Sequence, residues 1–183
     1  MNGELYVEKS PDETLGQDFL TWLWYRSEVA NTLKDEKGGE FTFFMEQRIV
    51  VQGGDGDAKE TASVSGVMSE LREARLGLAT GKKVTRALLR LEQEPETWRL
   101  TLKAEDFCLG SLKTPKVEAG ADKNDDPEAI FFEKVYLLEK CLSFLDALYK
   151  EFLKLRLGKD WAIEVDEFRK WLYQDSASGS TAA

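Results

Sequence analysis

Apolar and polar residues alternate along three segments in the first two thirds of the chain, which predicts strands of a sheet with one face in the core. These segments are residues 40–52, 84–92 and 97–104. Glu94-Pro95-Glu96 separates the last two and predicts a turn, so residues 84–104 are expected to form a hairpin.

Four segments carry apolar residues at helical spacing and predict helices. The other expected elements are short strands at residues 60–65 and 107–112 and helices at residues 11–29, 66–78, 127–157 and 159–173. A chain of 183 residues that is 42% hydrophobic can build one ordinary core. We therefore expect a single α+β domain over residues 1–174, an antiparallel sheet covered by about four helices including one long C-terminal helix, and a disordered tail over residues 175–183.

The long predicted helix carries two apolar rows, so it needs two packing partners. One row recurs at alternating spacings of four and three and comprises Phe131, Val135, Leu138, Leu142, Leu145, Tyr149 and Phe152. The other comprises Ile130, Leu137, Cys141, Phe144, Leu148 and Leu155. We expect one row to cover the sheet and the other to meet either another helix of the chain or a second protein chain, which makes the first row from Phe131 to Tyr149 a candidate partner interface.

The basic residues are concentrated in one stretch of an otherwise acidic chain. The net charge is −9, yet the stretch from Leu71 to Lys116 holds ten basic and six acidic residues, a balance of +4. The overall acidity argues against a protein that coats nucleic acid by bulk charge. Any contact with a polyanion is therefore expected to be local.

The predicted hairpin gathers part of this basic charge on one face. Strand alternation places Thr85, Ala87, Leu89 and Leu91 and then Trp98, Leu100, Leu102 and Ala104 toward the core. Arg86, Arg90, Arg99 and Lys103 then project from the opposite face, in a patch that suits phosphate groups. An ordinary solvent-exposed sheet face also carries charges, and Glu92 and Glu105 are close enough in sequence to neutralise part of it, so both interpretations stay open.

The residues offer little catalytic chemistry. The chain has no histidine, which excludes the common Ser/His, Cys/His and His-metal sites. Residues 77–83 have the wrong glycine spacing for a phosphate-binding loop, and the run from Gly53 to Asp57 is expected to be a turn rather than a calcium site. We expect neither enzymatic activity nor a metal or other cofactor.

Cys108 and Cys141 lack the spacing of a metal site and are expected to be free and buried. No segment has the length or composition of a membrane span, and the N-terminus lacks the pattern of a signal peptide. We expect a cytoplasmic protein.

Three blocks of residues in the same order resemble the C-terminal part of the recombination-associated protein RdgC family of bacteria. They are Phe-Leu-Thr-Trp-Leu at residues 19–23, Thr-Gly-Lys-Lys-Val-Thr-Arg-Ala-Leu at 80–88 continuing to Glu-Asp-Phe-Cys-Leu-Gly-Ser-Leu-Lys at 105–113, and Asp-Pro-Glu-Ala at 126–129. The N-terminal portion of the family has no counterpart in this sequence.

The resemblance implies a nucleoid-associated protein that binds duplex DNA without strong sequence preference, forms a ring-like dimer and restrains RecA-type recombinase. The positions matching the family's basic segment are Lys82, Lys83, Arg86 and Lys113, and the hairpin adds Arg90, Arg99 and Lys103 as candidate DNA-binding residues. The alternative is a module without DNA binding that contacts a protein partner, either a second copy or a separate N-terminal chain, through the long helix and the Trp-rich first helix.

Overall fold

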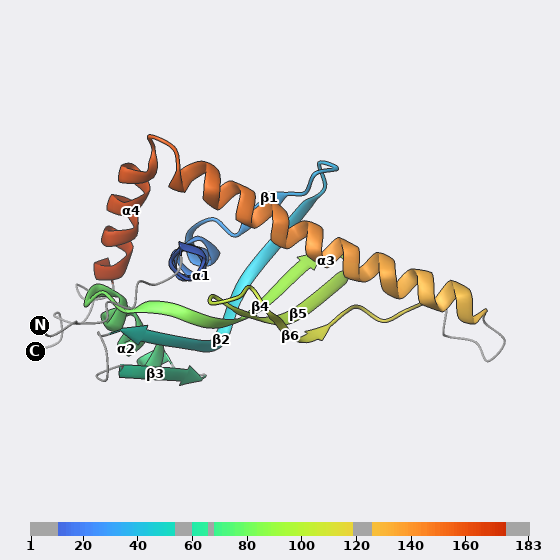
Figure 1. Ribbon diagram of the computed structural model, residues 1–183, viewed down its shortest axis with the longest axis horizontal. Coiled ribbons are helices and arrows are strands. Elements are labelled where there is room, and N and C mark those ends of the chain that lie inside the picture. The colour runs from blue at the N-terminus through green and yellow to red at the C-terminus, as the bar shows by residue number, and fades with distance from the viewer. Residues whose placement is uncertain (1–10, 54–59, 66–67, 119–125, 175–183) are drawn as a thin grey trace, which may run out of the picture.

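A computed structural model describes residues 11–53, 60–65, 68–118 and 126–174 (Figure 1). The described part of the chain forms a six-stranded antiparallel sheet with four helices, so the expected α+β class is confirmed. In chain order the elements are α1 (Pro11–Val29), β1 (Thr32–Lys34), β2 (Glu40–Gly53), β3 (Glu60–Ser65), α2 (Met68–Ala79), β4 (Lys83–Gln93), β5 (Glu96–Lys103), β6 (Leu109–Lys113), α3 (Pro127–Arg156) and α4 (Trp161–Gln174). The expected tail at 175–183 lies outside the described residues.

The long strand β2 organises the sheet. Its first half pairs with β1 and its second half with β3 on one edge, while β4 pairs along the other edge. The order continues from β4 to β5 and β6. β4 and β5 are joined by a tight turn and form the hairpin expected from the sequence. This hairpin lies between β2 and the edge strand β6.

Helices α1 and α3 lie on the same side of the sheet and bury its apolar face (Figure 1). The row of α3 that faces the strands is the second one expected from the sequence, and its buried members are Leu137, Cys141, Phe144 and Leu148. Phe152, the last member of the first row, is buried as well. Phe144 stacks on Phe41 with ring centroids 4.4 Å apart and meets Trp98 edge-on at 5.2 Å. The indole N–H of Trp98 donates to the carbonyl of Leu137 over 2.9 Å, so the core also fixes the position of the helix.

Helix α4 closes the domain against α1 and α2. Trp171 packs edge-on against Trp24 at 5.7 Å, and its indole N–H donates to Glu28 over 3.0 Å. Nearer the start of α4, Glu164 accepts a hydrogen bond of 2.9 Å from the indole N–H of Trp22. These contacts join the first and last described helices of the chain.

Two local features differ from the sequence prediction. Thr85 was expected to face the core, but the register between β2 and β4 shifts at this point, so that Val84 is buried instead and Thr85 donates its hydroxyl to the Val50 carbonyl at 3.3 Å. The short strand β1 was not predicted, because three residues that alternate between exposed and half-buried carry too little pattern to identify a strand.

Candidate nucleic-acid interface

The register of the hairpin brings the expected cations together. Arg86 lies opposite Lys103 and Arg90 lies opposite Arg99 across β4 and β5, and Lys113 on β6 lies opposite Arg99. Directly paired residues of an antiparallel sheet project to the same side. These five residues form what we call the outward basic face, on the side of the sheet away from α1 and α3.

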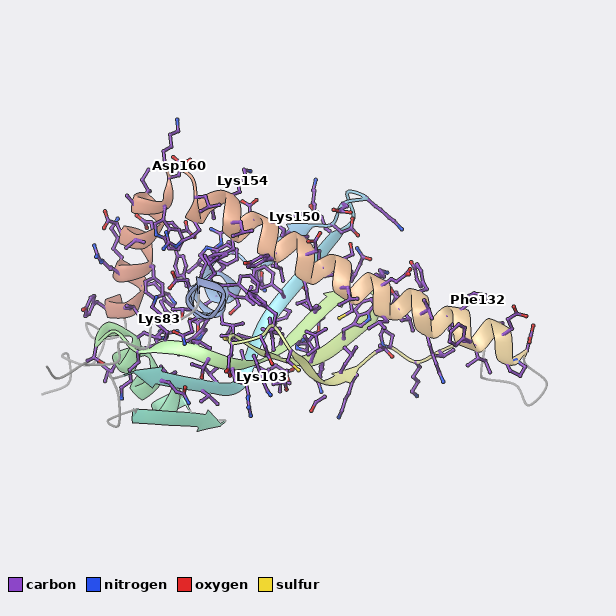
Figure 2. The ribbon with its side chains drawn as sticks, in the orientation of Figure 1. Lys83, Lys103, Phe132, Lys150, Lys154 and Asp160 are labelled. Atoms are coloured by element: carbon purple, nitrogen blue, oxygen red, sulfur yellow. The ribbon has the colours of Figure 1, made fainter. Side chains whose placement is uncertain are left out.

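The side chain of Lys103 illustrates this orientation, because it points away from the helical layer in Figure 2. Trp98, Leu100 and Leu102, which alternate with Arg99 and Lys103 along β5, are buried on the other side. The alternation of the hairpin therefore does what the sequence predicted: it separates a core face from a basic face.

Lys82 and Lys83 are not part of this face. Lys83 lies on the helical side in Figure 2, where its ammonium group forms an ion pair with Asp18 of α1. Asp18 also pairs with Arg156 of α3 at 3.3 Å. Lys83 is therefore part of an ion-pair cluster that connects β4, α1 and α3. The side chain of Lys82 packs beside Gly53 and Gly77, and its backbone N–H donates to the Gly77 carbonyl at 3.0 Å.

One acidic residue that the sequence did not single out neutralises the Arg90–Arg99 end of the outward basic face. A single carboxylate oxygen of Glu46 on β2 lies 3.1 Å from Nε of Arg90 and 3.3 Å from Nε of Arg99. Arg90 also pairs with Glu92, as expected from their proximity, and its guanidinium lies over the ring of Phe44 at 4.2 Å. The Arg90–Arg99 pair is therefore already matched by two carboxylates.

Glu46 was missed because β2 and β4 are neighbours in the sheet and not in the sequence. The signal was present in the alternation of residues 40–52, which places Glu46 on the polar face of its strand. Strand order was needed to show which cations it would meet, and a sequence pattern does not determine strand order.

Three residues of the outward basic face keep their charge: Arg86 and Lys103, which lie opposite each other, and Lys113, which lies beside Arg99 on β6. Among the described residues, no carboxylate forms an ion pair with Arg86, Lys103 or Lys113. Arg86 and Lys103 line a hollow of about 430 Å³. Its remaining lining residues are Gln17, Val50, Gln52, Thr85, Ala104 and Glu105.

The candidate partner interface on α3 is divided by the fold. Phe131, Leu138 and Leu142 are 61%, 40% and 45% exposed, whereas Val135, Leu145 and Tyr149 are half-buried. Tyr149 packs against Phe19 and Phe107, with ring centroids 5.2 and 5.1 Å away. The row is thus open at Phe131, Leu138 and Leu142, and the N-terminal end of α3 reaches beyond the strands (Figure 1).

The two cysteines differ from the expectation that both are buried. Cys141 is buried on the face of α3 that covers the sheet, and burial raises the pKa of its thiol to about 11. Cys108 is exposed, because it lies in the irregular segment before β6 rather than within a strand. Within the described ranges, no group of three or more acidic or cysteine side chains is arranged to hold a metal ion, and no helix is long and apolar enough to cross a bilayer.

No protein-family model matches the chain, and no curated protein matches it.

Proposed function

We propose that this protein is a non-catalytic DNA-binding protein that contacts the phosphate backbone through the outward basic face. The observation that carries the proposal is the cross-strand register, which sets Arg86 beside Lys103 and Arg90 beside Arg99 on one surface. Phosphate contacts position a protein on DNA without reading its sequence. The outward basic face is formed by strands and presents no helix to a groove, so the binding is expected to tolerate any sequence.

The charges also set the expected strength of the salt dependence. If only the three cations without a carboxylate partner contact phosphates, the logarithm of affinity falls with the logarithm of salt with a slope of about −2.7 on duplex DNA. If all five contribute, the slope is about −4.5. The net charge of −9 opposes binding at long range, which favours low affinity at physiological salt.

The role that we propose for this binding is the one implied by the resemblance to the RdgC family. A protein that occupies the backbone of a duplex competes with a RecA-type recombinase for that duplex. Addition of this protein to a strand-exchange reaction is therefore expected to slow it at low salt and to have less effect as salt is raised.

The test of DNA binding is fluorescence anisotropy of a labelled duplex and a labelled single strand, each titrated at several salt concentrations. The Arg86→Glu/Arg99→Glu variant reverses two charges of the outward basic face and should abolish binding. The matched control is Lys134→Glu/Lys154→Glu, which makes the same charge change at two exposed positions of α3. Unchanged affinity in the first variant, or equal loss in both, contradicts the assignment of the site.

A second candidate function is association with a second copy of this chain through α3, and it is favoured by the exposed row described above. The same helix face carries exposed Phe131 and, about 21 Å along the axis, an apolar hollow of about 250 Å³ beside Leu145. A two-fold axis near Leu138 would place the aromatic end of each helix in the hollow of the other.

Light scattering coupled to gel filtration tests this association. Leu138→Glu/Leu142→Glu should convert a dimer to a monomer, whereas Ile163→Glu, at an exposed apolar position of α4, should not. A wild-type protein that is monomeric at every concentration tested contradicts the association and leaves DNA binding unaffected.

A further inference from the structure

The two ends of the outward basic face differ in how their charge is compensated. At the Arg90–Arg99 end, one oxygen of Glu46 lies between the two guanidinium groups and occupies the place where an incoming anion would bind. At the other end, Arg86 and Lys103 lie opposite each other without an acidic partner among the described residues. Among the described residues of the outward basic face, an external anion would therefore meet two adjacent uncompensated cations at Arg86 and Lys103, and a single one at Lys113.

The backbone around this second end is held in place. The N–H of Ala104 donates to the carbonyl of Thr85 at 2.9 Å, and the N–H of Lys103 donates to the carbonyl of Cys108 at 3.2 Å. On the helical side, Gly16 of α1 lies so close that a Cβ atom there would be 2.8 Å from the carbonyl carbon of Ala104. A rigid floor lowers the entropic cost of binding a ligand.

The composition of the hollow suits a small oxyanion. Its volume of about 430 Å³ accepts a phosphate group together with some of its water. Arg86 and Lys103 supply charged donors, and the amide side chains of Gln17 and Gln52 also line the hollow. Glu105 also lines the hollow. The net charge of the lining is therefore positive, but the carboxylate of Glu105 would repel a bound anion.

We propose that the hollow between Arg86 and Lys103 is a discrete binding site for one phosphate oxyanion. The phosphate comes either from a DNA backbone, in which case the site rests on the proposed function, or from free inorganic phosphate. The Arg90–Arg99 pair binds no phosphate as long as both arginines form ion pairs with Glu46. DNA binding should accordingly depend on one end of the outward basic face far more than on the other.

One arm of the test uses inorganic phosphate without DNA. The protein is titrated with phosphate at constant ionic strength, with chloride as the compensating anion, and followed by amide NMR. Saturable shifts of the signals of Thr85 and Lys103, absent in Arg86→Gln/Lys103→Gln, are expected. Glu105→Gln should bind phosphate more tightly, because it removes the opposing charge.

The other arm compares two variants that lose the same charge from the same face. Arg86→Gln/Lys103→Gln should reduce the magnitude of the salt slope of DNA binding by about 1.8, as two lost phosphate contacts require, whereas Arg90→Gln/Arg99→Gln should change it by less than about half of that. Circular dichroism checks that both variants are folded.

The outcomes separate the two proposals. Equal loss of DNA affinity in the two variants would show that only the total charge of the face matters, and would overturn the discrete site. Phosphate binding by a wild-type protein that does not bind DNA would support the site, identify free phosphate as its source and refute the proposed function. DNA binding without any phosphate-dependent shift, and with full affinity in Arg86→Gln/Lys103→Gln, would overturn the site and leave the proposed function standing.

Discussion

Replacement of Gly16 by alanine is expected to destabilise the protein, although the same replacement normally stabilises a helix. Alanine gains about 1 kcal/mol over glycine inside a helix. At Gly16, however, the new Cβ would lie 2.8 Å from the carbonyl carbon and 3.1 Å from Cα of Ala104, and closer still to its carbonyl oxygen. The obstacle is backbone, so a change of rotamer does not relieve it.

The size of the effect follows from these two opposing contributions. Overpacking of a close contact costs about 1–3 kcal/mol, and the fixed strand end described above places Gly16→Ala toward the upper limit. After the helical gain is subtracted, a net loss of about 1–2 kcal/mol remains. For a chain of this length that loss lowers the melting temperature by about 2–8 °C.

Gly77→Ala in α2 is the matched control. There the new Cβ would lie 3.3 Å from Cδ of Lys82 and 3.8 Å from Cγ1 of Val51, and the lysine stem can move. This variant is expected to be unchanged or up to about 1 kcal/mol more stable. Urea unfolding followed by tryptophan fluorescence measures both, and a Gly16→Ala protein as stable as wild type would refute the reasoning.

Three further results are expected. Phe144→Ala should lower the free energy of unfolding by about 3–5 kcal/mol in the same urea assay, because it removes the ring between Phe41 and Trp98; a loss below 1 kcal/mol would contradict this packing. Burial raises the pKa of Cys141 from 9.0 to about 11, so its contribution to stability is fully present below pH 9 and is lost as pH rises to about 11. The loss is about 2–3 kcal/mol, and Cys141→Ala should lack this part of the pH dependence of unfolding measured between pH 8 and 11. Glu46→Gln should raise DNA affinity and steepen the salt slope by about 1–2, because it releases Arg90 and Arg99, whereas Glu94→Gln in the exposed hairpin turn should do neither; equal effects of the two would show that only net charge matters.

The sequence predicted the elements of the fold well, because each has a long or sharply bounded pattern. The first helix was expected at residues 11–29 and occupies Pro11–Val29, and the basic hairpin was expected within one residue of its strands. The final helix begins at Trp161 rather than at residue 159, since the chain first turns through Gly158. The bulge at Thr85 was not predictable, because it depends on pairing with a strand more than thirty residues away.

The candidate site was predictable only in part. Alternation within the hairpin was enough to group Arg86, Arg90, Arg99 and Lys103. It was not enough to exclude Lys83, whose position depends on Asp18 in a helix that is remote in sequence. The compensation of charge by Glu46 likewise depends on strand order, so the sequence showed where cations gather but not which of them are available to a ligand.

The contacts between α1 and α4 affect how this chain folds during its synthesis on the ribosome. The pairs Trp22 with Glu164 and Glu28 with Trp171 span 142 and 143 residues. α1 therefore leaves the ribosome long before α4 does, and its tryptophan side chains lack their α4 partners during that time. Contacts of such long range slow folding and leave apolar surface open in the meantime. α1 is expected to remain prone to aggregation until α4 packs against it, unless a chaperone covers its apolar surface.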